Sequence, residues 1–430
     1  MGNLKGWGME DKWKEMRFGD CADLVRDACQ PNESFGKPYI GLEHIEQGTL
    51  RLNSTGIAED VTSTKSDFKK GDILFGKLRP YFRKVVRPMF EGICSTDIWV
   101  VRAKDGFDQG FLFYWMASKE FVDIANQGSE GTKMPRAKWD FVIKIKQTVP
   151  PLPEQKAIAS ILGALDDKIE LNRKMNETLE AMARALFKSW FVDFLPVRAK
   201  ESARTQTGDP ILSKEISELF PDELEDSLLG KIPKGWRVGS LDEIATYLNG
   251  LALQKYPPEN DYEFLPVIKI AQLRKDNTEG SDKASINIAP AYVVSDGDIL
   301  FSWSGSLEVV IWCGGCGALN QHLFKVTSKN YPKWFYYLWT KHHLPDFQTI
   351  AAGKATTMGH IQRHHLATVK VLVPPPNLLK AMDTIMSPVI ENKIVNSVQS
   401  RTLASIRDAL LPKLLSGEIR VKDAKSKFEL

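Results

Sequence analysis

The sequence predicts an α+β protein in which two globular units of mixed α/β structure, related as a pseudo-two-fold repeat, are separated by two long antiparallel helices. The repeat is visible in short motifs, because Gly71–Phe75 recurs as Gly297–Phe301 and Val149–Pro151 recurs as Val373–Pro375. Each Val-Pro-Pro motif precedes a long segment with apolar residues at helical spacing. The length of 430 residues also exceeds what one hydrophobic core usually organises.

The first globular unit is expected at residues 1–150. Phe111–Ala125 carries apolar residues at helical spacing and predicts a helix. Short apolar runs bounded by turn residues predict strands at 38–42, 72–75, 98–101 and 141–143. Helix and strands in one segment of this length indicate a mixed α/β unit.

The first long helix is expected at residues 151–196. Its apolar residues alternate steps of four and three, which is the pattern of a coiled-coil seam. The predicted seam consists of Ile158, Leu162, Leu165, Ile169, Leu179, Ala183, Leu186 and Trp190. Asn172 and Asn176 occupy the two seam positions at its middle. The helix would be roughly 60 Å long at the usual helical rise.

A linker rich in charge, Ser and Thr follows at residues 197–234, with a short amphipathic piece at Ile211–Phe220. The second unit is expected at residues 235–374, where the order of elements repeats. Strands are predicted at 266–270 and 323–326, and a helix at 334–341. The motifs match at the ends of the two units and diverge inside them, which suggests one scaffold with two different surfaces.

The second long helix is expected at residues 375–417, followed by a C-terminal tail at 418–430. Asn392 and Asn396 hold the same register in its seam as the first Asn pair does. Pro388 lies inside it, and either kinks the helix at a cost of about 3 kcal/mol or marks a helix start capped by Ser387. Because the second helix must run back along the first to bury its seam, the pair is predicted to be antiparallel.

The four Asn residues would then meet near the crossing and fix the register of the helix pair, since buried polar groups in a seam specify register. The alternative is that they face solvent or another chain.

Composition sets few limits on function. The net charge of +3 neither demands nor excludes nucleic acid, but Lys65–Arg87 holds eight basic and two acidic residues. Five sparse cysteines argue against a disulfide framework, and Cys313–Cys316 is expected to be a Gly-Gly turn between strands. With no apolar run of about 18 residues and no apolar signal core, a cytoplasmic protein without membrane contact is expected.

The usual motifs of an enzyme are missing from the sequence. Lys354 follows a glycine but lacks the rest of a phosphate-binding loop, and we find neither a dinucleotide-type Gly-rich loop nor an Asp/Asn-Pro-Pro-aromatic motif for base methylation. Glu154–Lys156 matches only a fragment of a nuclease motif. The adjacent pairs His342-His343 and His364-His365 do not share a helix face. The sequence therefore predicts no catalytic residues and no metal site.

Loop residues suited to reading nucleic acid remain. Arg and Lys can bridge guanine or hold phosphates, and Asn and Gln can pair with adenine. The candidates in the first unit are Lys77, Arg79, Tyr81, Arg83, Lys84, Lys133 and Arg136. Those in the second unit are Ser302, Trp303, Ser304, Ser306, Asn320, Gln321, His322, Lys354, Thr356, Thr357, His360, Gln362 and Arg363. The first set is more basic, so the two units are expected to read different sequences.

Several longer motifs resemble those of the specificity subunit of type I restriction-modification systems. They are Val149-Pro-Pro-Leu-Pro-Glu-Gln-Lys156, Trp190-Phe-Val-Asp-Phe194, Leu219-Phe-Pro-Asp-Glu-Leu224, Ile232-Pro-Lys-Gly-Trp236, Ser302-Trp-Ser-Gly-Ser306 and Leu410-Leu-Pro-Lys-Leu-Leu-Ser-Gly-Glu-Ile419. The resemblance covers nearly the whole chain. It implies two target-recognition domains, each binding one half of a bipartite, asymmetric double-stranded DNA target, with paired helices that set the gap between the halves.

The same resemblance implies that the helices dock two modification (methyltransferase) subunits and that restriction subunits join to translocate and cut DNA. S-adenosylmethionine, ATP and Mg are then expected in those partners, and this chain would be a non-catalytic subunit of an adenine methyltransferase and endonuclease complex in defence against foreign DNA. Two alternatives are a fused methyltransferase or nuclease, which lacks motifs, and a coiled-coil scaffold that binds only protein.

Overall fold

The computed structural model describes residues 13–131, 133–202, 214–353 and 359–421. The chain divides into two compact units: unit 1 is Met1–Lys168 with Leu403–Leu430, and unit 2 is Ile169–Thr402. The long helices α5 (Leu152–Phe191) and α13 (Pro376–Ser416) each contribute one part to each unit. Each unit is therefore completed by two helix segments that are distant in sequence.

The described residues of unit 1 form three sheets. The central four-stranded sheet has the order β2–β10–β7–β8 (Ala22–Val25, Ile98–Ala103, Ile73–Gly76, Val85–Val86). A five-stranded sheet has the order β3–β6–β9–β4–β5 (Ala28–Cys29, Lys65–Phe68, Gly92–Cys94, Pro38–Ile40, Gly56–Ile57). The ends of the globular segment are joined by the antiparallel pair β1 (Lys14–Arg17) and β11 (Lys146–Val149), in which Lys14 lies opposite Val149.

Unit 2 repeats this arrangement. Its central sheet has the order β15–β22–β19–β20 (Thr246–Asn249, Leu323–Thr327, Ile299–Ser302, Val309–Ile311). A second sheet has the order β17–β16–β21–β18 (Lys283–Ala284, Leu265–Ile268, Gly317–Leu319, Val293–Val294). The closing pair is β14 (Arg237–Ser240) with β23 (Lys370–Val373), with Arg237 opposite Val373. The predicted repeat of two mixed α/β units is confirmed.

The short helices repeat as well. Unit 1 has α1 (Phe18–Cys21), α2 (Gln109–Ala117), α3 (Lys119–Gln127) and α4 (Trp139–Val142), and unit 2 has α8 (Leu241–Ile244), α9 (Ile270–Lys275), α10 (Lys333–His342), α11 (Leu344–Ala352) and α12 (Arg363–Thr368). The helix predicted at 111–125 is two helices, because the Ser118 side chain caps a new helix by accepting from Phe121 N. The strand predicted at 141–143 is wrong, since Phe141 and Val142 belong to helix α4 and Ile143 follows it with helical backbone angles.

Aromatic side chains dominate the core of unit 2. Trp334 and Phe335 of α10 are buried among Phe187, Trp190 and Phe191 of α5. The rings of Phe191 and Phe335 approach to 5.7 Å between centroids. Ala183, Leu186 and Trp190 of the predicted seam belong to this core, and Phe187 and Phe191, which the seam did not include, complete the surface on which the globular part of unit 2 packs.

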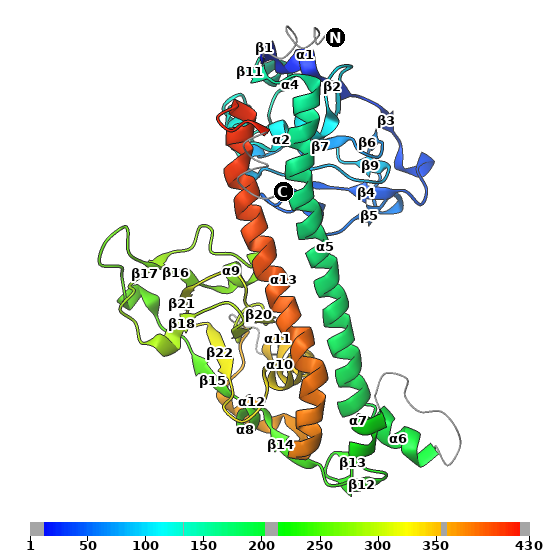
Figure 1. The fold of residues 1–430 in the computed structure, drawn as a ribbon, viewed down its shortest axis with the longest axis vertical. Coiled ribbons are helices and arrows are strands. Elements are labelled where there is room, and N and C mark those ends of the chain that lie inside the picture. Colours follow the sequence, from blue (N-terminus) through cyan, green and yellow to red (C-terminus); the bar gives the residue numbers. More distant parts are fainter. Residues whose placement is uncertain (1–12, 132, 203–213, 354–358, 422–430) are drawn as a thin grey trace, which may run out of the picture. The chain divides into compact units, whose positions relative to one another are not determined.

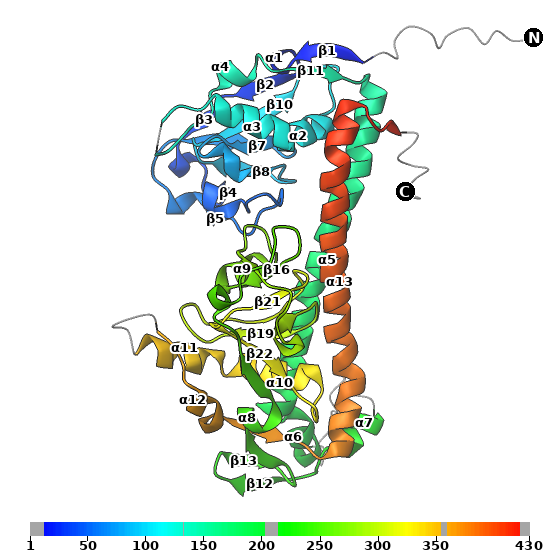
Figure 2. The same cartoon turned by 90° about the vertical axis from the view of Figure 1, so that its left-hand side faces the viewer.

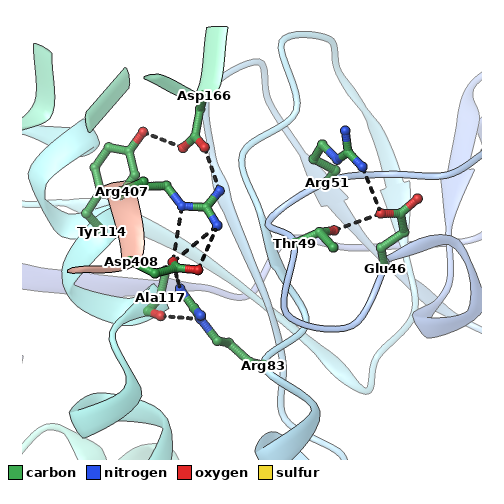
Figure 3. Close-up of polar contacts among 9 residues, drawn as sticks. All are labelled: Glu46, Thr49, Arg51, Arg83, Tyr114, Ala117, Asp166, Arg407 and Asp408. Carbon is green, nitrogen blue, oxygen red and sulfur yellow. Dashed lines mark hydrogen bonds and ion pairs between the residues drawn. The ribbon is translucent and has the colours of Figure 1, made fainter. Parts of the chain in front are cut away.

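The α5 and α13 segments lie side by side in each unit (Figures 1 and 2). In unit 1, Arg407 of α13 is 3% exposed and donates to Asp166 Oδ1 of α5 at 2.6 Å. The Tyr114 hydroxyl of α2 donates to the other Asp166 oxygen at 2.7 Å (Figure 3). This network, the Asp166 cluster, connects both long helices to the globular part of unit 1.

In unit 2, the helices meet through a polar network around Asn172, which is fully buried. Its Nδ2 donates to Asn396 O (3.3 Å), and Asn396 Nδ2 donates to Asn176 Oδ1 (3.0 Å). Successive contacts pair increasing residue numbers on α5 with decreasing residue numbers on α13. The two helices are therefore antiparallel, as predicted. Asn392 was expected in this network, but its side chain is exposed. The Asn176 Nδ2 group instead donates to the backbone carbonyl of Lys393, the residue after Asn392, at 3.1 Å.

A second buried network in unit 2, the Glu180 cluster, joins three helices. Glu180 of α5 forms ion pairs with Lys341 of α10 and Lys393 of α13, and the Tyr337 hydroxyl donates to it at 3.3 Å. Burial alone would raise the pKa of Glu180, but the ammonium groups of Lys393 and Lys341 lower it to about 2. The carboxylate is therefore ionised and is the electrostatic centre of this helix junction.

Pro388 does not start a helix. α13 is one helix from Pro376 to Ser416, and Pro388 lies on it as an exposed residue. The alternative that Ser387 caps a helix beginning at Pro388 is therefore wrong. Proline has no amide hydrogen, so the helix loses one backbone hydrogen bond here. Water can bond to the carbonyl left without a partner, because the position is exposed.

The first long helix ends at Phe191, earlier than predicted, and the segment that follows contains α6 (Leu195–Ser202), α7 (Lys214–Leu219) and a hairpin of β12 (Leu224–Ser227) with β13 (Gly230–Pro233). Gly315, with φ of +99°, forms the predicted turn between Cys313 and Cys316. Among the described residues, none of the helices has the length and apolar character needed to cross a membrane.

Candidate nucleic-acid interface

The loop after β7 in unit 1 is a rigid turn. Arg79 and Arg83 flank a 3-10 turn at Pro80–Phe82, and both have left-handed backbone angles, with φ of +51° and +48°. Arg79 N donates to Pro135 O at 2.7 Å, which ties the turn to the loop before α4. Left-handed angles are unfavourable for arginine, and such strain is often found at functional sites.

This turn presents an aromatic side chain to solvent. Tyr81 is 48% exposed, and its ring lies edge-on against Phe82 at 4.6 Å between centroids. Lys77 is half-buried at the start of the same loop, and Lys133 is exposed on the loop that the turn contacts. Tyr81, Lys77 and Lys133 thus remain accessible candidates for nucleic-acid contact.

Two predicted contact residues are engaged within unit 1. Arg83 Nε donates to Ala117 O at 2.7 Å and Nη2 lies 3.3 Å from Asp408 Oδ1 (Figure 3). Lys84 Nζ donates to Leu42 O at 2.5 Å, and burial lowers the pKa of Lys84. These bonds make Arg83 and Lys84 residues that position the turn.

Arg136 is held by a carboxylate. Its Nε donates to Asp97 Oδ1 at 2.9 Å and its Nη2 to Asp97 Oδ2 at 3.2 Å. The hydrogen bond to Asp97 raises the pKa of Arg136. Arg136 is nevertheless exposed, so the guanidinium is fixed in orientation without being covered.

The loop after β19 in unit 2 has the same backbone bonds as the loop after β7. In unit 1, Lys77 N donates to Asp97 O and Ala137 N donates to Lys77 O, both at 2.9 Å. A β-bridge also joins Leu78 to Arg136.

The matching bonds in unit 2 run from Trp303 N to His322 O (3.3 Å) and from Ile361 N to Trp303 O (3.0 Å), with a bridge between Ser304 and His360. Lys77, Asp97 and Arg136 therefore correspond in position to Trp303, His322 and His360. Gly305, with φ of +66°, corresponds to Arg79.

These positions carry different chemistry in unit 2. Trp303 Nε1 donates to Asn249 Oδ1 at 2.8 Å, and its ring lies 5.9 Å from that of His322 and 6.3 Å from that of His360. Ser304 Oγ lies 3.0 Å from His322 Nδ1. Aromatic and imidazole rings thus replace the charged groups of unit 1.

The other candidates of unit 2 are spread more widely. Asn320 is buried and accepts from His322 N, so it shapes the loop. Gln321 Nε2 lies 3.3 Å from His322 Nε2, Ser306 contacts Arg274, and Ser302 is buried. Gln362 is exposed, and Arg363 donates to Tyr247 O at 3.3 Å. Lys354, Thr356 and Thr357 lie outside the described residues.

Sequence reasoning missed the partners that orient the candidate side chains. Asp97 precedes the apolar strand β10, and Asn249 ends β15, so neither stands in a recognisable motif. The available signal was weak: polar residues at the ends of two central strands often lie at a functional edge of a sheet. Their pairing depends on sheet order, which the sequence does not specify.

Comparison with known proteins agrees with this architecture. The sequence profile of the type I restriction modification DNA specificity domain matches residues 10–181 and 233–400. The chain is 25% identical to the type I restriction enzyme HindI specificity subunit of Haemophilus influenzae, with 95% of this chain and 99% of that protein covered. It is 27% identical to the MjaIX specificity subunit of Methanocaldococcus jannaschii, with 91% and 86% covered.

The fold is also that of a solved structure. The S subunit of a type I restriction-modification system from M. genitalium matches with a TM-score of 0.54 and 15% identity, over 96% of this chain and 99% of that one. This likeness confirms the fold class of two mixed α/β units connected by long helices.

Proposed function

The chain belongs to the type I restriction-modification DNA specificity family, and from this premise we propose that it recognises a bipartite, asymmetric double-stranded DNA target with one half-site for each unit. Unit 1 binds one half and unit 2 binds the other. The restriction subunits of such a complex would act on DNA that this chain has selected.

The observation that carries this proposal is the pair of equivalent loops after β7 and β19. Their backbones are fixed by the same hydrogen bonds, whereas their side chains differ at each corresponding position, as Lys77 and Trp303 illustrate. Variable side chains on a constant backbone are what two readers of different sequences require.

The proposal also gives a role to the outer face of α5. Leu171, Met175 and Met182 are 50%, 42% and 48% exposed, and their spacing places them on one side of the helix. Exposed apolar stripes of this kind commonly mark a protein-binding surface. We assign this stripe to a modification subunit, which supplies S-adenosylmethionine and the methyl-transfer chemistry, so the chain itself is non-catalytic.

Substitution of the stripe should prevent docking. Met175→Lys with Met182→Lys is expected to reduce co-purification of the modification subunit at least tenfold, since desolvating two ammonium groups opposes association. Thermal unfolding should be unchanged, because both residues are exposed. Lys174→Met, a change at an exposed residue beside the stripe, is the control. Full co-purification of the double variant would contradict the assignment.

DNA contact has a separate test. The complex with its modification subunit is expected to bind random duplex DNA with an affinity that falls as salt rises, because bound phosphates release counterions. Lys133→Ala should lower the slope of log K against log salt by about 1, whereas Lys231→Ala on the β12–β13 hairpin should not. Absence of salt-dependent DNA binding, even with the modification subunit present, would favour a scaffold that contacts only protein.

A further inference from the structure

The Arg136–Asp97 pair in unit 1 has the geometry of a base-reading group. A guanidinium has five N–H donors in a planar fork. Asp97 takes the Nε hydrogen and one Nη2 hydrogen, through bonds of 2.9 and 3.2 Å. The donors left are the two on Nη1 and the second on Nη2. One hydrogen on Nη1 and the second hydrogen on Nη2 point in parallel along the end of the fork, away from Nε, and the other Nη1 hydrogen points to the side opposite Asp97.

That remaining edge matches one base in particular. Two parallel N–H groups fit the O6 and N7 acceptors that guanine presents in the major groove, whereas adenine presents a donor beside N7. Asp97 also restricts the rotation of the side chain, which lowers the conformational entropy lost on binding. The Arg136 side chain is 47% exposed, so its outer edge is open to a ligand.

The corresponding place in unit 2 lacks this group. The shared backbone bonds make His360 of unit 2 equivalent in position to Arg136 of unit 1, and His322 equivalent to Asp97. The indole of Trp303 lies close to both imidazole rings, at 5.9 and 6.3 Å between ring centroids. An imidazole cannot offer the two-donor fork, so unit 2 cannot read guanine in the same way from this position.

We propose that Arg136, oriented by Asp97, reads a guanine in the half-site bound by unit 1, and that His360 gives unit 2 a different base preference at the corresponding place. This inference rests on the proposed function and deepens it. Arg136 is the base-contacting residue, and Asp97 is a positioning residue that acts through it.

The test uses the full chain expressed with its modification subunit in a host without DNA methylation, and maps methylated motifs by long-read sequencing. Arg136→Ala and Arg136→Lys should each relax one guanine position in one half-site. Methylation rates on duplexes that differ at that base pair should show a preference reduced roughly 10- to 100-fold. Arg136→Lys keeps the positive charge but lacks the planar fork of N–H donors. It also provides the test on its own if heating shows that the alanine variant is unstable.

Matched variants separate base reading from general binding. Lys138→Ala, at an exposed cation that also pairs with a carboxylate (Glu130), should leave the motif unchanged. Asp97→Ala should relax the same guanine position, and adding it to Arg136→Ala should have no further effect. His360→Ala should relax one position of the other half-site only.

An unchanged motif in both Arg136 variants, relaxation at a base other than guanine, or equal weakening on all sequences would overturn the inference. If the unsubstituted complex gives no bipartite motif, the proposed function fails instead, whatever the variants show.

Discussion

Glu180→Ala is expected to destabilise unit 2 by about 3 kcal/mol, because removing one member of a buried ionic network leaves the other members uncompensated. The Glu180 side chain is only 12% exposed, and it is the shared partner of Lys341 and Lys393. Its loss would leave two ammonium groups and the Tyr337 hydroxyl without their acceptor at a junction of three helices. Chemical denaturation of the purified chain, followed by tryptophan fluorescence, measures the effect.

Glu177→Ala is the matched control on the same helix. The Glu177 side chain is 62% exposed and pairs with Arg173 on the surface of α5, so its removal should cost less than about 0.5 kcal/mol. Equal effects of the two substitutions would show that the Glu180 cluster adds nothing beyond a surface ion pair.

The same carboxylate makes acid stability predictable. The pKa of Glu180 falls from 4.5 to about 2 on folding, so the folded state favours the ionised form. Its contribution is complete above the unfolded pKa and is lost as the pH falls towards about 2. Glu180→Gln should therefore remove part of the pH dependence of stability between these two values, although the other carboxylates will still titrate.

Replacing residues 235–374 with the corresponding segment of another family member is expected to change one half of the DNA target completely and leave the other half intact. The segment is closed, because β14 and β23 pair with Arg237 opposite Val373. Its two ends therefore lie together, and a replacement enters and leaves at one place. Mapping of methylated motifs in cells that carry each chimera gives the result.

The design must keep the core that the segment shares with α5. Trp334, Phe335 and Trp339 pack among Phe187 and Phe191, so the incoming segment should retain large aromatic residues at these positions. A reciprocal replacement of residues 14–149, closed by β1 and β11, should change the other half-site only. Changes in both half-sites from either chimera would contradict a division of recognition between the units.

The sequence predicted the long helices well because their signal is periodic and local. Buried Ile158, Leu162 and Ala183 follow the expected seam. The prediction of Asn392 was wrong because one residue of rotation along α13 moves a side chain from the seam to solvent. In its first half, α13 fully buries Met386 and Ile390, whereas the preceding residues Ile385 and Val389 are only partly buried.

The interface was less predictable for a different reason. The basic character of Lys65–Arg87 was evident, but the choice between contacting DNA and holding the loop depends on partners far away in sequence. Arg83 bonds to Ala117 and Arg136 bonds to Asp97 only because the sheet order brings these segments together. Composition identifies a set of cations, and only tertiary structure divides it into positioning and exposed groups.

The two buried ionic networks have a consequence for pairing between separate copies of the chain. In both units α5 supplies the carboxylate, Asp166 or Glu180, and α13 supplies a cation, Arg407 or Lys393. If two copies of α5 aligned antiparallel through Asn172 and Asn176, Asp166 of one would lie near Glu180 of the other. Two copies of α13 would likewise oppose Arg407 and Lys393. Like charges buried against each other are strongly unfavourable, so this charge distribution discourages homotypic helix exchange and favours closure of the two helices within one chain.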